Sequence, residues 1–130
     1  ATHADGWQTD GTPVDAFRER FNIIRRHADE LGRDLSNFEG SLHMMVNINE
    51  DEDAAFEQAT TFLGSYYGAG MISRERAETW IACGSPQSVI DKIAAYIEAG
   101  CTMPVLRFVA PDPRQQLQRC IEEVLPAFKV

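Results

Sequence analysis

Residues 103–111, with the sequence MPVLRFVAP, constrain the fold most, because this run is apolar on both of its faces. In an extended strand alternate side chains point to opposite faces, so Val105, Arg107 and Val109 share one face. A strand that is apolar on both faces is typical of a parallel α/β sheet covered on both sides. Arg107 interrupts the pattern, and a guanidinium inside such a layer needs an anion or several acceptors.

A second strand is predicted over residues 38–48, FEGSLHMMVNI, which alternate with a period of two. One face carries apolar side chains throughout: Leu42, Met44, Val46 and Ile48. The other face is mixed: Ser41, His43, Met45 and Asn47. The pattern indicates a strand with one face in an apolar core and one face partly polar.

Helix signals lie before, between and after these strands, as cap residues followed by apolar residues at helical spacing. The predicted starts are Thr12 with Pro13 at the first helical position, Asn49 paired with Glu52, Ser73, Ser85 followed by Pro86, and Asp112 followed by Pro113. The first helix is expected to end at Gly32, and the last one carries Leu117, Ile121 and Leu125 as apolar positions. The order of helix, strand, helices, strand and helix predicts a parallel α/β fold.

Composition narrows the function classes. The net charge of −8 argues against nucleic acid as a partner, because phosphate binding needs a basic surface. No apolar run approaches the roughly 20 residues that cross a bilayer. The three cysteines, Cys83, Cys101 and Cys120, have no C-x-x-C spacing, and no metal-ligand spacing is present. They are expected to be reduced thiols of a cytoplasmic protein without a metal.

The predicted sheet is too small to stand alone. Two strands, with whatever residues 1–7 supply, leave apolar edges and an inner apolar layer uncovered. We therefore expect residues 1–130 to be one segment of a larger barrel or open sheet, incomplete by itself. Such a chain would form a homo-oligomer or pack against a missing N-terminal part.

The order of these segments resembles one known family. Residues 84–128, GSPQSVIDKIAAYIEAGCTMPVLRFVAPDPRQQLQRCIEEVLPAF, resemble the C-terminal end of the bacterial luciferase-like monooxygenases. HADGW, residues 3–7, resembles the end of the sixth strand in that family, and HADELGRD, residues 27–34, the exit from the next helix. The resemblance implies the C-terminal part of a (β/α)₈ TIM-type barrel, about strands six to eight with their helices.

The resemblance also implies cofactor and site. Family members use reduced FMN or the deazaflavin coenzyme F-420, which residues outside this chain would mainly bind. Barrel sites lie at the carboxyl ends of the strands. Four candidates for substrate or cofactor binding follow, and no catalytic residue is assigned: Trp7, His43, Asn47 and Arg107.

Each candidate has a plainer alternative. Arg107 either contacts a ligand or forms a structural ion pair with a carboxylate, for example from the missing strands. Trp7 is either a core aromatic or a wall of the flavin pocket. His43 lies mid-strand, which favours a hydrogen-bonded interior histidine over a general base. Asn47, nearer the barrel mouth, is the better candidate for ligand contact.

The sequence therefore predicts part of a luciferase-like oxidoreductase or monooxygenase acting on a small organic substrate. The isolated 130-residue chain is expected to be inactive, because roughly five-eighths of the barrel would be absent. The rival prediction is a self-associating α/β interaction module without catalysis.

Overall fold

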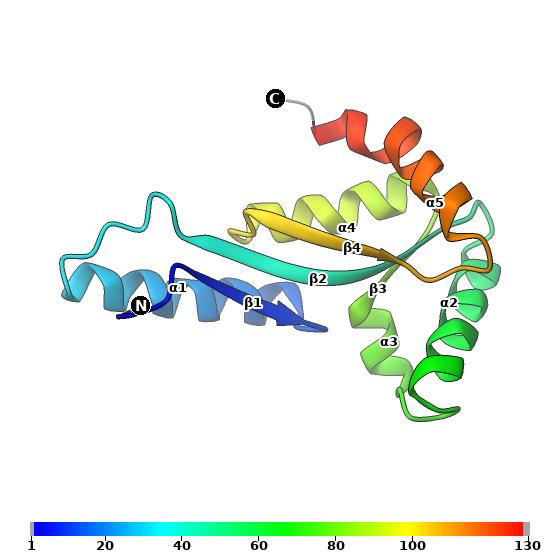
Figure 1. Ribbon diagram of the computed structural model, residues 1–130, viewed down its shortest axis with the longest axis horizontal. Coiled ribbons are helices and arrows are strands. Elements are labelled where there is room, and N and C mark those ends of the chain that lie inside the picture. The colour runs from blue at the N-terminus through cyan, green and yellow to red at the C-terminus, as the bar shows by residue number, and fades with distance from the viewer. Residues whose placement is uncertain (1, 129–130) are drawn as a thin grey trace.

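The computed structural model describes residues 2–128 as a parallel sheet packed with helices (Figure 1). The strands are β1 (Gly6–Asp10), β2 (Glu39–Ile48), β3 (Ile81–Gly84) and β4 (Met103–Phe108). The helices are α1 (Val14–Glu30), α2 (Glu52–Tyr67), α3 (Arg74–Trp80), α4 (Pro86–Glu98) and α5 (Pro113–Arg119). A π-helical turn (Cys120–Val124) and a 3-10 turn (Leu125–Phe128) extend α5. The predicted parallel α/β class is confirmed.

Strand β2 is the centre of the sheet and pairs in parallel with each of the other three strands. Residues 41–43 pair with both β1 and β4, so these two strands lie on opposite edges of β2. Residues 45–48 pair with β3, which therefore lies on the same edge as β1 but further along β2. The strands expected from the sequence thus lie side by side in the order β1, β2, β4.

The face of β2 that was predicted to be apolar packs against helices. Leu42, Met44, Val46 and Ile48 are all buried. They share one core with residues of α1, α4 and the turn after α5: Phe17, Phe21, Val89, Ile93, Tyr96, Cys120 and Val124. Leu106 and Phe108, which alternate with Arg107 along β4, pack against the same core.

The opposite face of the sheet is covered at its carboxyl end. Met45 and Val109 are fully buried there against Leu63 of α2 and Trp80 of α3. The expectation of an uncovered inner layer is therefore wrong for this half of the sheet, because α2 and α3 turn back over it (Figure 1). The remaining inner positions of β2, toward its amino end, include the half-buried His43.

Two strand boundaries differ from the prediction. The first strand does not end at Trp7 but begins at Gly6, and its pairing continues from Gly6 opposite Glu39 to Asp10 opposite His43. Strand β3 was not predicted at all. Its four residues are too few to show an alternating pattern, and pairing with the end of β2 is what makes them a strand.

Helix α1 begins differently from the prediction as well. Pro13 is its N-cap, without a side-chain cap bond, and Thr12 is buried one residue earlier. The Thr12 carbonyl oxygen accepts a hydrogen bond of 2.7 Å from the Tyr96 hydroxyl of α4, which ties the start of α1 to α4. Gly32 follows the helix end with a φ of +64°, the conformation expected of a terminating glycine.

The cap of α2 also shifts. Asp51, not Asn49, accepts the hydrogen bond from the Ala54 amide that opens the helix. The Asn49 side chain instead accepts from the Asp51 amide, so it shapes the turn between β2 and α2. The other three predicted caps are confirmed, each with its side chain accepting from the first turn: Ser73, Ser85 and Asp112.

The last helical segment turns its apolar stripe outward. Leu117, Ile121 and Leu125 are 49%, 48% and 44% exposed, whereas Cys120 and Val124 enter the core. Strand β4 pairs with β2 alone among the described residues, so its other edge is open. No helix within residues 2–128 has the length and apolar character needed to cross a membrane.

The tie between α1 and α4 can be tested by changing Tyr96 to phenylalanine. The change leaves the buried Thr12 carbonyl without its donor and is expected to lower the free energy of unfolding by about 1–2 kcal/mol. Urea denaturation measures this loss. Tyr67→Phe, in an exposed ring, is the matched control, and an equal effect of both changes would contradict a role for the hydroxyl.

The open β4 edge and the outward stripe lead us to expect that the isolated chain self-associates, because such surfaces rarely remain exposed in monomers. Leu117→Lys combined with Ile121→Lys should shift the equilibrium toward monomer, while Ile23→Lys, at another exposed apolar position, should not. Sedimentation velocity reports the masses. A stable monomer of the unmodified chain at micromolar concentration would refute the expectation.

Candidate functional site

Strand register decides which predicted site residues share a face. Asp10, His43 and Val105 form one cross-strand row on the inner face, and Met45 with Arg107 forms the next. Asn47 lies opposite Cys83 at the carboxyl end of the same face. The sheet therefore brings His43, Asn47 and Arg107 onto one surface, in the order the alternation predicted.

Trp7 lies on the other face of the sheet. Its ring centroid is 5.0 Å from that of Phe17 and 6.4 Å from that of Phe21, both on α1. Of the two alternatives for Trp7, the geometry matches the core aromatic, because β1 presents this side chain to the helix layer. The structure does not bring it together with the other three candidates.

Arg107 is half-buried and contacts aromatic rings of α2. Its guanidinium carbon is 4.7 Å from the ring centroid of Tyr66 and 6.0 Å from that of Phe62. Among residues 2–128 it makes no ion pair. Aromatic faces attract a cation but carry no net charge. The positive charge of Arg107 is therefore not neutralised by any described carboxylate.

His43 is half-buried in the row below Arg107, and Asp10 is its neighbour in register on β1. The hydrogen bond expected for an interior histidine is not formed within the described part of the chain. Neither ring nitrogen is thus committed to a protein partner. This leaves His43 able to donate to or accept from a group held over the inner face.

Asn47 is fully buried at the carboxyl end of β2. Its Nδ2 donates to the Val109 carbonyl oxygen at 3.2 Å and to Oε1 of Gln58 at 3.3 Å. Its Oδ1 is buried and accepts no hydrogen bond from the described residues. Asn47 therefore positions Gln58 of α2, rather than lying open to solvent.

Gln58 itself was missed by the sequence analysis, although the signal was present. It falls on the buried side of α2, between Ala55 and Ala59 and four residues before Phe62, all apolar. A glutamine inside an apolar helical stripe needs a polar partner, and here the partner is Asn47.

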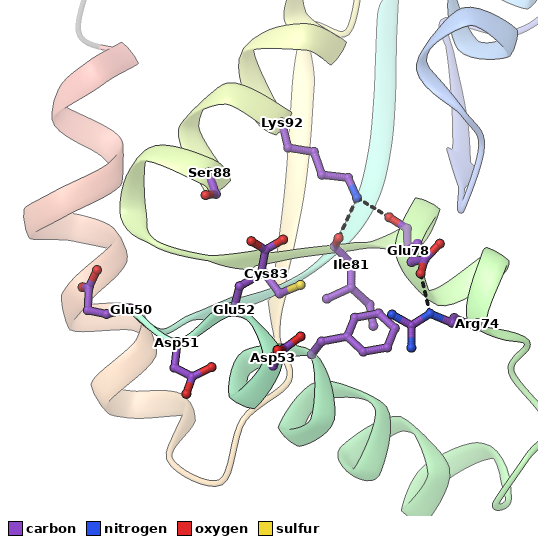
Figure 2. A pocket seen from close by; sticks show the side chains of 11 residues that line it. Glu50, Asp51, Glu52, Asp53, Arg74, Glu78, Ile81, Cys83, Ser88 and Lys92 are labelled. Atoms are coloured by element: carbon purple, nitrogen blue, oxygen red, sulfur yellow. Dashed lines mark hydrogen bonds and ion pairs between the residues drawn. The ribbon is translucent and has the colours of Figure 1, made fainter.

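A cavity of about 670 Å³ lies at the outer edge of β3 and contains none of the four predicted residues (Figure 2). It is lined from the starts of α2 and α4, from α3 and from β3: Glu50, Asp51, Glu52, Asp53, Phe56, Arg74, Glu78, Ile81, Cys83, Ser88 and Lys92. Carboxylates outnumber cations among these residues. The cavity therefore favours water or a cationic group over an anion.

Lys92 links two elements that line this cavity, α3 and β3. Its Nζ donates to the carbonyl oxygens of Glu78 and Ile81, both at 2.6 Å, and so holds the end of α3 against β3 (Figure 2). Burial lowers the pKa of Lys92, an effect that the nearby Cys83 and Glu78 oppose. With two of its three donors bonded to backbone, Lys92 has a structural role here.

Burial raises the pKa of the Cys83 thiol, while the charge of Lys92 lowers it and that of Glu52 raises it further. At neutral pH Cys83 is therefore a neutral thiol and a weak nucleophile. All three cysteines are free.

These shifts predict the alkylation behaviour of Cys83. Iodoacetamide should modify it slowly near neutral pH and faster as rising pH forms the thiolate. Lys92→Met removes the charge that lowers this pKa, so modification should slow further. Arg74→Met, in the same cavity but without an effect on the Cys83 pKa, is the control. Mass spectrometry of the Cys83 peptide measures the rates, and faster modification in Lys92→Met would contradict the account.

Solved structures of two oxidoreductases show the same fold. A coenzyme F-420-dependent tetrahydromethanopterin reductase from Methanopyrus kandleri superposes with a TM-score of 0.73 at 21% identity, over 97% of this chain and 46% of its own. An F-420-dependent secondary alcohol dehydrogenase superposes with a TM-score of 0.79 at 18% identity, over 98% and 44%. At such identities the likeness shows the fold. The chain spans less than half the length of either structure.

A long-chain alkane monooxygenase is similar too, with a TM-score of 0.67 at 20% identity, over 97% of this chain and 36% of its own. In sequence, the 5,10-methylenetetrahydromethanopterin reductase of Methanopyrus kandleri is 31% identical over 61 residues, which cover 46% of this chain and 18% of the relative. The model of the luciferase-like monooxygenase family matches residues 1–103, most of the chain. The chain therefore belongs to the luciferase-like monooxygenase family.

Proposed function

We propose that this chain is the C-terminal part, about strands six to eight with their helices, of a (β/α)₈ barrel in a flavin- or deazaflavin-dependent oxidoreductase. Three adjacent parallel strands in the order β1, β2, β4 support this assignment. The open edge of β4 supports it as well, because a barrel would close that edge with its first strand. The chain's share of its structural relatives, 46% and 44%, leaves room for the earlier strands.

In this proposal the inner face of β2 and β4 forms one wall of the substrate and cofactor site. The main support for this is the environment of Arg107, a half-buried cation whose described contacts are the rings of Tyr66 and Phe62. A cation beside aromatic rings fits a cofactor that is both anionic and aromatic, as FMN and coenzyme F-420 are. The bound cofactor would supply hydride or oxygen transfer, and the protein binding and orientation.

His43 and Asn47 complete this wall. His43 offers a ring without a described partner in the middle of β2, and Asn47 orients Gln58 at the carboxyl end. Trp7 has no place in the proposed site, because it packs between the sheet and α1. The substrate is proposed to be a small organic molecule, and the cytoplasmic setting expected from the free thiols remains a prediction.

Two arrangements account for the charge of Arg107. It pairs either with an anionic group of the cofactor or substrate, or with a carboxylate from the strands outside this chain. The half-buried position near the mouth favours the ligand, because unpaired charges cluster at functional sites. The rival function, a self-associating module without catalysis, draws on the exposed stripe on the last helix.

We expect Arg107→Lys in the full-length protein to weaken cofactor or substrate binding about tenfold, because lysine does not reproduce the bidentate fork of a guanidinium. Fluorescence titration with FMN and with coenzyme F-420, followed by steady-state kinetics, measures the change. Arg18→Lys, on the exposed side of α1, serves as the control.

Unchanged binding and kinetics in Arg107→Lys with an unchanged melting temperature would refute the site role. A large loss of thermal stability with normal kinetics would assign Arg107 to a structural ion pair instead. Absence of binding to either cofactor by the unmodified full-length protein would favour the interaction module.

A further inference from the structure

Two cavities adjoin at the carboxyl ends of β2 and β4, and both are lined by Gln58 and Pro111. One, about 310 Å³, also contains Asn49 and Gln115, and the other, about 370 Å³, also contains Thr61 and Phe62. We call this pair of cavities the Gln58 groove. Its size lies within the range of small-molecule sites, and carboxyl ends of parallel strands are where such sites form.

Hydrogen bonding to Asn47 fixes the orientation of the Gln58 side-chain amide. A backbone carbonyl oxygen only accepts hydrogen bonds, so the Asn47 atom facing the Val109 carbonyl must be the donor, Nδ2. The second hydrogen of the same nitrogen points to Gln58, which must therefore present its acceptor, Oε1. The Nε2 donor of Gln58 is left directed away from Asn47, and it bonds to no described residue.

Behind Gln58, a second polar atom also lacks a partner, although Asn47 lines neither cavity. Asn47 Oδ1 is buried without a hydrogen-bond donor among residues 2–128. Buried polar atoms are nearly always paired, because an unpaired one costs about 1–3 kcal/mol. Of the two linked amides, only Gln58 lines the groove, and its unused Nε2 donor is the group that can meet a ligand there.

The charges around the groove select against an anion. Glu57 and Asp112 line the two cavities with carboxylates. Arg119, at the end of the smaller cavity, is already held by Glu50 at 2.6 Å and by Glu123 at 2.7 Å. No described cation in the groove is thus free of a carboxylate partner. A neutral acceptor suits the Gln58 donor better than an anionic one.

We propose that the Gln58 groove binds a neutral carbonyl group of a small ligand, with Gln58 Nε2 donating to the carbonyl oxygen. Phe62 and Pro111 provide apolar surface for the body of the ligand. Asn47 acts as a positioning residue, since it sets which end of the Gln58 amide faces the groove. This inference adds a ligand contact to the proposed function. It rests on that function in one respect only, namely that the groove is part of the substrate pocket.

The probe is δ-valerolactam, a neutral ring with one carbonyl, titrated into the cofactor-free full-length protein and followed by saturation-transfer NMR. Gln58→Glu keeps the acceptor toward Asn47 but replaces the donor, and Gln58→Leu removes the amide at similar size. Both should weaken lactam binding about tenfold. Gln87→Glu makes the same chemical change at an exposed position of α4, outside the groove, and should leave binding unchanged.

Circular dichroism confirms that each variant is folded before its titration is interpreted. Cyclohexanecarboxylate, a ring of similar size with an anionic group, should bind the unmodified protein more weakly than the lactam. Equal lactam binding in Gln58→Glu, Gln58→Leu and the unmodified protein would overturn the proposal. Tighter binding of the carboxylate would overturn it too. Neither result depends on Arg107 or on cofactor binding, so it would leave the proposed function standing.

Discussion

Strand β2 is the constraint on which the rest of the structure depends. It pairs with all three other strands, and nearly every side chain from residue 40 to residue 48 is buried. Because a parallel strand of this apolarity does not leave a face open to water, both of its faces must be covered. Helices α1 and α4 cover one face along most of its length, while α2 and α3 cover only the carboxyl end of the other.

Helices cover only the carboxyl end of the inner face, and this decides which side chains meet there. At the carboxyl end Met45 and Val109 form a small second core with α2 and α3, which fixes the position of α2. With α2 in place, Phe62 and Tyr66 meet Arg107, and Gln58 meets Asn47. The polar groups of the proposed site are therefore positioned by packing rather than by a charged network. The sheet places Asn47 and Arg107 on one face, and α2 provides the side chains that contact them.

The sequence predicted the parts of this structure that depend on local periodicity. Alternation assigned the faces of β2 and β4 correctly, and the cap-then-proline signals located the starts of α4 and α5. Strand β3 and the start of α1 escaped prediction, because they depend on contacts distant in sequence. The cap of α2 is local, but Asn49 and Asp51 are both good cap residues, and the sequence pattern favoured the wrong one. Thr12 looks like a cap locally, but its hydroxyl bonds back to Thr9 and to the Asp10 carbonyl oxygen. Its own carbonyl oxygen accepts from Tyr96, 84 positions later.

For the site, alternation placed His43, Asn47 and Arg107 on one face, but it did not provide their partners. The sequence pointed to an anion for Arg107, whereas the folded chain provides aromatic rings from α2 and leaves its charge unpaired by described carboxylates. Trp7 was ambiguous until the register of β1 set its direction. Gln58 shows the complementary lesson, that a polar residue inside an apolar helical stripe indicates a buried partner.

The central claim, that a strand from outside this chain closes the β4 edge, is tested most directly by hydrogen exchange in the full-length protein. Val109 donates its N–H to β2, so by alternation the N–H groups of Leu106 and Phe108 point to the open edge. The account predicts that these two amides are protected as strongly as those of Val105 and Arg107, which face β2. Fast exchange of Leu106 and Phe108 beside slow exchange of Val105 and Arg107 would contradict it.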